Sequence, residues 1–163
     1  MKKILTILLM SVMIYSCSNQ QTGTAVVQDS DELSLNAKSL LKAYFDNDFS
    51  LWEELFSEDC EVFITNNAMD KKATIEALKQ ERALFESFSV QEDYSHTNYF
   101  NNGGIWTNHW FIVNATGKYT GETNTVRVHT DLKWENGKVV IFQVYRDPSV
   151  TMKEVTAMSE MSK

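Results

Sequence analysis

The sequence has few of the residues that cross-link or interrupt a chain. Among its 163 residues there are only 2 cysteines and 1 proline. Because Cys17 has a separate role, described below, Cys60 alone cannot form an internal disulfide, and stability must come from packing. Cys60 lies in an apolar run typical of a strand. We therefore expect a buried structural thiol rather than a catalytic one.

Basic residues are also scarce. The chain has 15 lysine and arginine residues against 22 aspartate and glutamate residues, a formal net charge of −7. Loss of residues 1–16, which hold two lysines and no acidic residue, would take this charge to −9. No basic patch is present to neutralise phosphate groups, so the composition excludes a nucleic-acid partner.

The N-terminus has the three-part layout of a secretory signal peptide. Lys2 and Lys3 precede an apolar stretch at residues 4–15, which is shorter than the roughly 20 residues that span a bilayer. Residues 14–17, Ile-Tyr-Ser-Cys, resemble the lipobox of bacterial lipoproteins, although Tyr15 is bulkier than usual. The resemblance implies a signal peptide at 1–16 and a lipid on Cys17. It also implies a cell-envelope location on a periplasm-facing membrane, inner or outer. The alternative is an ordinary secretory signal cleaved nearby.

The rest of the chain divides into a tether and one domain. Residues 17–31 are polar and lack a sustained hydrophobic period, which predicts a flexible tether. We expect a domain over residues 32–158 and a disordered tail at 159–163. Apolar spacing predicts a first helix over residues 32–46. A short second helix should begin after Ser50 as N-cap, and a third should run from residue 71 to about 88 with Asp70 as N-cap.

The pattern changes to strands after residue 88. A first strand is predicted at 59–65, and four long strands follow at about 88–100, 104–116, 123–135 and 138–147. Turn signals separate them, the strongest being Asn102-Gly103 and Asn136-Gly137. A short helix to about residue 158 follows Pro148. Helices first and an antiparallel sheet afterwards indicate an α+β fold class.

This order of elements resembles the nuclear transport factor 2-like superfamily, which includes domains of the SnoaL-like polyketide cyclase type. Residues 136–147 resemble the closing strand of that family, and residues 106–121 resemble its preceding Trp-rich strand. The resemblance implies a cone-like, strongly bent antiparallel sheet with N-terminal helices covering its concave face and a pocket between. The superfamily includes isomerases, dehydratases, cyclases and non-catalytic binders, so the fold does not choose a function.

The turns also predict which side chains face the pocket, because side chains alternate along a strand. The predicted register places Leu132 opposite Ile141, Thr130 opposite Gln143 and Trp110 opposite Ser95. The predicted pocket face has an apolar part and a polar part. The apolar part is Trp106, Trp110, Ile112, Leu132, Trp134 and Ile141, and the polar part is Asp93, Ser95, Asn108, Thr130, Gln143, Tyr145 and Asp147.

A carboxylate in such a cavity has a raised pKa and can act as a general base. The catalytic candidates are therefore Asp147 and Asp93, with Tyr145 as a proton donor. The alternatives are that Asp147 shapes the strand exit before Pro148 and that Asp93 lies at a solvated rim. The candidate ligand-pocket residues are Trp110, Asn108, Thr130, Gln143, Trp134 and His129.

The same register places three histidines, His96, His109 and His129, in a row on the opposite face. Three imidazoles could hold zinc. Charged residues such as Arg127 share this face, however, as is typical of a solvent-facing or dimer-forming surface, and we expect no metal and no cofactor. His129 stays among the pocket candidates because one β-bulge would turn it into the cavity.

Three functions remain open. The first is binding of a hydrophobic small molecule of unknown identity. The second is an enzyme of isomerase, dehydratase or cyclase type with a pocket aspartate as base. The third is protein interaction or homodimerisation through the mixed sheet face, where Val140, Phe142 and Val144 would form an exposed apolar patch.

Overall fold

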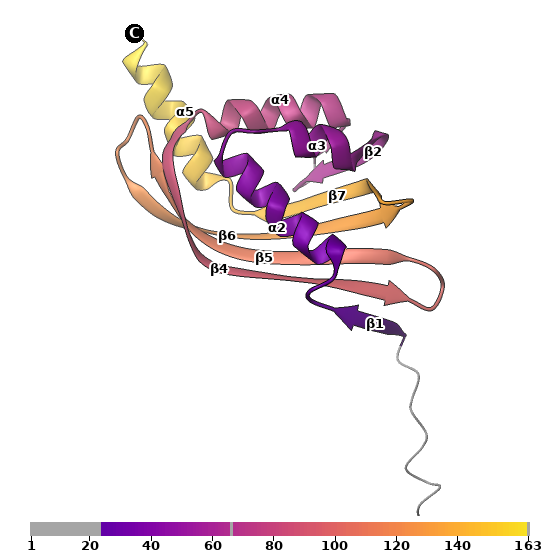
Figure 1. The fold of residues 1–163 in the computed structure, drawn as a ribbon. Helices are drawn as coiled ribbons and strands as arrows, with labels where there is room; N and C mark the ends of the chain where they lie inside the picture. The colour runs from indigo at the N-terminus through magenta and orange to yellow at the C-terminus, as the bar shows by residue number, and fades with distance from the viewer. Residues whose placement is uncertain (1–23, 66, 163) are drawn as a thin grey trace, which may run out of the picture.

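The computed structural model of the protein describes residues 24–65 and 67–162 (Figure 1). The predicted signal peptide, Cys17 and the first part of the predicted tether lie outside these residues. Within the described part, seven strands form one sheet in the order β1-β4-β5-β6-β7-β2-β3. All neighbouring strands are antiparallel except β2 and β7, which are parallel. The predicted α+β fold class is confirmed.

Four helices form in the described part: α2 (Glu32–Phe45), α3 (Ser50–Leu55), α4 (Lys71–Arg82) and α5 (Ser149–Met161). Asp31 and Asp70 cap α2 and α4, and the Asp70 carboxylate accepts from Ala73 N at 2.7 Å. The predicted cap at Ser50 is wrong, because Phe49 is the N-cap residue of α3 and Asp48 accepts from Ser50 N. None of the described helices is long and apolar enough to cross a membrane.

The strands differ from the predicted ones mainly at their ends. Their bounds are β1 (Ala25–Gln28), β2 (Phe56–Ile64), β3 (Asn67–Met69), β4 (Phe85–Phe100), β5 (Ile105–Gly117), β6 (Thr123–Glu135) and β7 (Lys138–Arg146). Strand β1 corrects the tether prediction, since residues 25–28 pair with the edge of β4. Strand β4 begins where a helix was predicted. Helix α5 also runs through residues 159–161, which were predicted to be a disordered tail.

The long strands β4 to β7 bend strongly, and the helices lie on their concave side (Figure 1). The core lies between this side and helices α2, α3 and α4. Trp52 of α3 fixes the packing there, since its Nε1 donates to Leu40 O of α2 at 3.1 Å. Cys60 is buried in the same cluster as predicted, and burial raises the pKa of its thiol to about 11.

Two local irregularities decide which side chains face the core. Phe100 and Gly104 enclose a three-residue loop in which Gly103 adopts φ +85°, so Tyr99 lies opposite Ile105. The predicted two-residue loop would have placed Tyr99 opposite Trp106. Strand β5 is thereby displaced by one residue, and every side chain on it exchanges faces relative to the prediction.

The second irregularity is a bulge in β7. Trp134 lies opposite Val139 as predicted, but Lys133 then lies opposite Ile141, which leaves Val140 as the extra residue. Beyond this bulge, Phe142 and Val144 point inward and are buried. The predicted outer patch of Val140, Phe142 and Val144 is therefore wrong. A bulge was expected to turn His129 of β6 inward, whereas the bulge is in the neighbouring strand.

Candidate active site

A cavity of about 100 Å³ lies between the concave face of the sheet and helices α2, α4 and α5. Most of its wall is apolar and includes Leu40, Leu41, Phe45, Phe111, Val128 and Phe142. Small-molecule sites in proteins commonly measure about 300–1,000 Å³. The cavity as it stands therefore fits only a small molecule.

His109 is the most buried titratable side chain of the cavity wall, with 2% of its surface exposed. Its Nε2 lies 2.7 Å from Asp93 Oδ1 of the neighbouring strand β4. Burial lowers the pKa of His109 because a charged imidazolium loses its hydration, and the Asp93 carboxylate opposes this shift only in part. His109 is thus neutral at pH 7.

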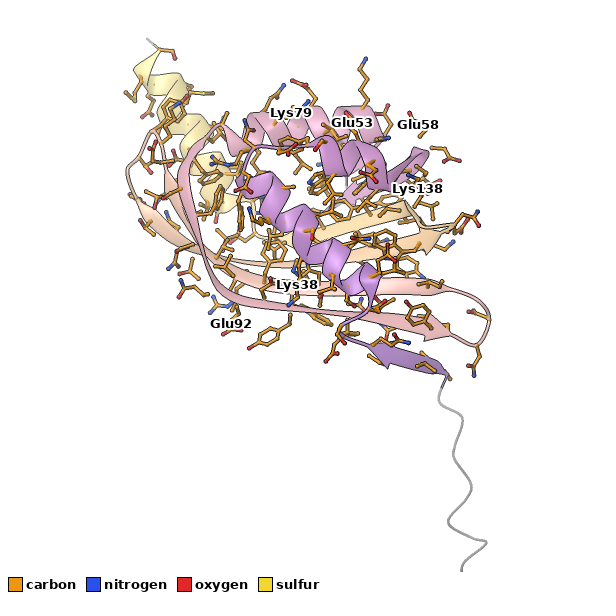
Figure 2. All side chains as sticks on the ribbon, in the orientation of Figure 1. Lys38, Glu53, Glu58, Lys79, Glu92 and Lys138 are labelled. Carbon is orange, nitrogen blue, oxygen red and sulfur yellow. The ribbon has the colours of Figure 1, made fainter. Side chains whose placement is uncertain are left out.

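The hydrogen bond to Asp93 also fixes which ring nitrogen of His109 carries the proton. An ionised Asp93 accepts only, so Nε2 of His109 must donate to it, and Nδ1 keeps its lone pair. Lys38 of α2 supports the carboxylate, since its Nζ donates to Asp93 O at 3.0 Å and lies 3.8 Å from Oδ1 (Figure 2). A neutral imidazole with one unprotonated ring nitrogen has the chemistry that a general base needs.

A second polar group lies at another part of the wall, where α4, β7 and α5 meet. Arg146 Nη1 donates to Glu81 Oε1, and Thr151 Oγ1 donates to the same oxygen at 2.8 Å. Burial alone would lower the pKa of Arg146, but the Glu81 charge outweighs this and raises it. The contacts of Glu81 with Arg146 and Thr151 tie three elements together beside the cavity.

Tyr44 of α2 lines the cavity as a neutral phenol. Its pKa is raised, chiefly because burial disfavours the phenolate and further because of the Glu81 charge. A neutral phenol can donate a hydrogen bond, and a guanidinium such as Arg146 can donate several. The wall thus carries one base and two donors in otherwise apolar surroundings.

Helix α5 closes one end of the cavity and is held by a buried carboxylate. Glu154 Oε2 accepts from Tyr119 N at 2.8 Å and Glu154 Oε1 accepts from the Thr120 hydroxyl, both in the β5–β6 turn. Gly117 leaves the space for this contact, since a Cβ there would lie 1.9 Å from Glu154 Oε1. Val150 and Thr151 of the same helix line the cavity.

Of the predicted site residues, only some lie on the cavity side of the sheet. Asp93 and Thr130 do, and Thr130 lines the cavity. Trp134 also points inward, but it belongs to the packed core and donates to Thr107 Oγ1 at 2.9 Å. Asp147 lies at the cavity mouth and is exposed. Its carboxylate accepts a hydrogen bond from Ser149 N at 2.9 Å, so it shapes the start of α5.

The other predicted residues lie on the outer face, which corrects the prediction. Trp110 and Asn108 are there because of the three-residue loop before β5, and Gln143 and Tyr145 because of the bulge in β7. His129 lies between Trp110 and Tyr145 on this face. The three histidines do not converge, and the described residues contain no group of three side chains able to hold a metal ion.

Four cavity residues were missed: Tyr44, Glu81, His109 and Arg146. His109 had been placed on the opposite face by the register error, and no role had been predicted for the other three. A signal for His109 existed in the sequence, since Phe111 and Val113 follow it at two-residue spacing and give its face an apolar continuation.

Comparison with known proteins supports the fold and nothing finer. No known protein family matches the sequence, and no curated protein matches it. The structure is similar to a protein of Silicibacter sp. TM1040 assigned as a polyketide cyclase, with a TM-score of 0.59 and 12% identity over 78% of this chain and 97% of that one. It is also similar to AclR of Streptomyces galilaeus, assigned as a hydroxylase, with a TM-score of 0.57 and 14% identity over 77% and 96%.

A third similar structure is a protein of Jannaschia sp. CCS1 assigned as a SnoaL-like polyketide cyclase. Its TM-score is 0.52 at 14% identity, over 80% of this chain and 98% of that one. The chain therefore shares the α+β fold of these structures. At these identities the likeness says nothing about substrate or chemistry, which must be argued from the cavity.

Proposed function

We propose that the domain catalyses proton transfer on a small, neutral, mainly apolar carbonyl compound, as an isomerase, dehydratase or cyclase does. The observation that carries the proposal is the His109–Asp93 pair in the wall of an apolar cavity. Nδ1 of His109 takes a proton from the carbon next to the carbonyl, and Asp93 stabilises the imidazolium that forms. Tyr44 and Arg146 are the donors available to the developing oxygen charge.

Size and charge limit the substrate of this proposed reaction. An engineered protein cavity of about 150 Å³ binds benzene, so a cavity of about 100 Å³ favours a molecule of similar or smaller size. The buried and half-buried charges of the cavity region come in opposite pairs, Glu81 with Arg146 and Asp93 with Lys38, whereas Asp147 at the mouth is exposed. A neutral ligand disturbs neither pair.

The test is deuterium exchange into small cyclic ketones in D₂O, measured by mass spectrometry. The wild-type chain should catalyse exchange, and His109→Gln should lower it about 10²–10⁴-fold, since that is the usual contribution of a general base. Asp93→Asn should lower it as well, because the tautomer of His109 is no longer fixed. His129→Gln is the matched control on the outer face and should leave it unchanged. Equal rates in all four proteins and in buffer would contradict the proposal.

A non-catalytic binder is the second candidate. It is favoured by the mutual pairing of the cavity's polar groups, since Glu81, Arg146 and Thr151 already satisfy one another. The same experiment separates the two functions. Ketones that raise the melting temperature of the wild-type chain without any exchange would support binding alone.

We further propose that the domain is a lipoprotein held at the cell-envelope membrane through Cys17. The proposal rests on the sequence of residues 1–17 alone. Cys17→Ala should abolish labelling by a fatty-acid probe and release the chain from membranes, whereas Cys60→Ala, the matched control, should do neither. Labelling that persists in Cys17→Ala would refute it.

A further inference from the structure

Asp93 is the member of the His109–Asp93 pair that water can reach. Its side chain is 29% exposed, whereas that of His109 is 2% exposed. Asp93 lies in β4, and β1 pairs with residues 97–100 of that strand, so no strand of the described chain covers the edge at Asp93. A carboxylate in contact with water can exchange a protein partner for a water molecule. The pair therefore needs a further contact that keeps Asp93 turned toward His109.

The backbone of β4 is irregular just before Asp93. The pairing of β4 with β5 shifts between Val90 and Glu92, which leaves Gln91 as an extra residue. Bulges of this kind re-aim the side chains beside them. Asp93 points to the side of the sheet that α2 covers, whereas Figure 2 shows Glu92 pointing away from that side. Asp93 is thus the acidic residue of this stretch that lies within reach of α2.

Helix α2 is aligned with this part of β4 by polar contacts at a spacing of one helical turn. Ser34 Oγ lies 2.9 Å from Thr97 Oγ1, and Ser95 Oγ donates to Ser34 O at 2.9 Å. Lys38 follows Ser34 by four residues and therefore lies on the same face of the helix, one turn further on. Asp93 precedes Ser95 by two residues and therefore lies on the same face of β4. The next contact along the two elements is that of Lys38 with Asp93.

Lys38 holds Asp93 at two points. Its Nζ donates to Asp93 O at 3.0 Å and lies 3.8 Å from Asp93 Oδ1. Oδ1 is the same oxygen that lies 2.7 Å from His109 Nε2. The contact with the carbonyl oxygen fixes the backbone of Asp93, and the charge of the ammonium keeps Oδ1 in place. With an acceptor held there, Nε2 stays the ring nitrogen of His109 that carries the proton.

We propose that Lys38 is a positioning residue, which fixes the Asp93 carboxylate against His109 and thereby keeps His109 in the tautomer whose Nδ1 is unprotonated. The proposal deepens the proposed function, because it rests on His109 as the base and identifies what prepares that base. Lys38 does not line the cavity, so it acts through Asp93 rather than on the substrate.

The charge of Lys38 acts on His109 in the same sense. Burial lowers the pKa of His109 most, Asp93 of β4 raises it, and Lys38 of α2 and His129 of β6 lower it further. Loss of the Lys38 charge should therefore raise this pKa. The other titratable side chains of the cavity wall are Tyr44, Glu81, Arg146 and Asp147, which the variants below leave in place.

The test is ¹⁵N NMR of the ring nitrogens in the full chain, purified in detergent with labelled histidine. The ¹⁵N shift of each nitrogen reports whether it carries the proton, and His109→Gln assigns the signals, because those of His109 are missing from its spectrum. The neutral wild-type His109 should have a protonated Nε2 and an unprotonated Nδ1. Lys38→Met, a neutral side chain of similar length, should give a mixture of the two tautomers and a raised pKa. Lys38→Arg, which keeps the charge, should restore the wild-type state.

Lys42→Met is the matched control. Lys42 lies one turn further along α2, is exposed and pairs with Asp46, so its loss should change neither the tautomer nor the pKa of His109. Lys38→Gln is a second neutral variant, for use if Lys38→Met does not fold, and should also give mixed tautomers. A neutral Lys38 variant that loses stability in urea but keeps the wild-type tautomer would overturn the proposal and make Lys38 a clamp for α2. Mixed tautomers in the wild-type chain would overturn it as well.

The kinetics of deuterium exchange into small cyclic ketones separate this proposal from the proposed function. Lys38→Met should lower kcat by about 10–10²-fold with KM unchanged, because the base is misplaced while the cavity wall stays intact. A wild-type chain without exchange would contradict the proposed function alone, since the tautomer of His109 is measured without substrate. Mixed tautomers together with a wild-type kcat would overturn the role of Lys38 in the reaction.

Discussion

The inner and outer faces of the sheet each carry a histidine beside an aspartate. His109 Nε2 lies 2.7 Å from Asp93, and His129 Nε2 lies 2.9 Å from Asp131. His109 is buried and hydrogen-bonded, and burial lowers its pKa. His129 is partly exposed, and its Nε2 lacks hydrogen-bond geometry toward any described residue. The two histidine–aspartate pairs have similar distances but differ in burial, and burial decides what a histidine beside a carboxylate can do.

The ion pairs of the two faces should also differ in how much they stabilise the fold, and removing the buried pair should have the largest effect on stability. Glu81→Gln leaves Arg146 as an uncompensated buried charge and should lower the free energy of unfolding by about 3–5 kcal/mol. Glu135→Gln removes an exposed partner of Lys133 on the outer face and should cost at most about 1 kcal/mol. Urea denaturation of both variants measures the difference. Equal losses would show that the Glu81–Arg146 pair is more hydrated than its burial suggests.

The difference between the two histidines depends on the closure of the cavity by α5. Gly117→Ala forces a methyl group into the Glu154 carboxylate and should destabilise the domain by about 1–3 kcal/mol. If α5 then loosens, water reaches His109 and its pKa should rise toward that of an ordinary histidine. NMR titration of the His109 imidazole measures this. Gly137→Ala, in an open turn with φ +74°, tests backbone strain alone and should leave the pKa of His109 unchanged.

The buried histidine should make stability depend on pH in one direction. Because the pKa of His109 is lower in the folded chain, the unfolded chain takes up the proton first as the pH falls below about 6.5. The free energy of unfolding should therefore fall toward acid pH, with a slope of at most about 1.4 kcal/mol per pH unit from this group. His109→Gln should flatten the profile below about pH 6.5. An unchanged profile would mean that His109 is not the responsible group.

The smallest effect is expected on the outer face. His129→Gln removes one ring from the stack between Trp110 and Tyr145 and should lower the free energy of unfolding by about 0.5–1.5 kcal/mol. Thermal unfolding of the variant beside the wild-type chain measures this. A loss well above that range would show that the stack organises the sheet.

Much of the fold follows from local pattern. The apolar spacing of residues 32–46, the aspartate cap at 70 and the Asn136-Gly137 turn each specify a local structure, and the helices and the turn form there. Residues 85–88 were assigned to a helix because Phe85 continues the helical stripe. In the structure they begin β4 instead, because pairing with β5 overrides a weak local preference. Strand β1 was missed for the same reason, since only the edge of β4 makes residues 25–28 extended.

The sequence by itself determined the α+β class, the α4 cap at Asp70 and four long strands with a turn between each pair. It did not determine which face of β5 points inward, because both faces mix apolar and polar residues: Trp106, Asn108, Trp110 and Ile112 alternate with Thr107, His109 and Phe111. The predicted two-residue loop at Asn102-Gly103 assigned the wrong face. A third loop residue at 101–103 and the bulge at Val140 settled the matter, since a shift of one residue exchanges the two faces of a strand. The extra loop residue places His109 at the cavity, and the bulge at Val140 places Arg146 there. Packing across the whole sheet stabilises both irregularities.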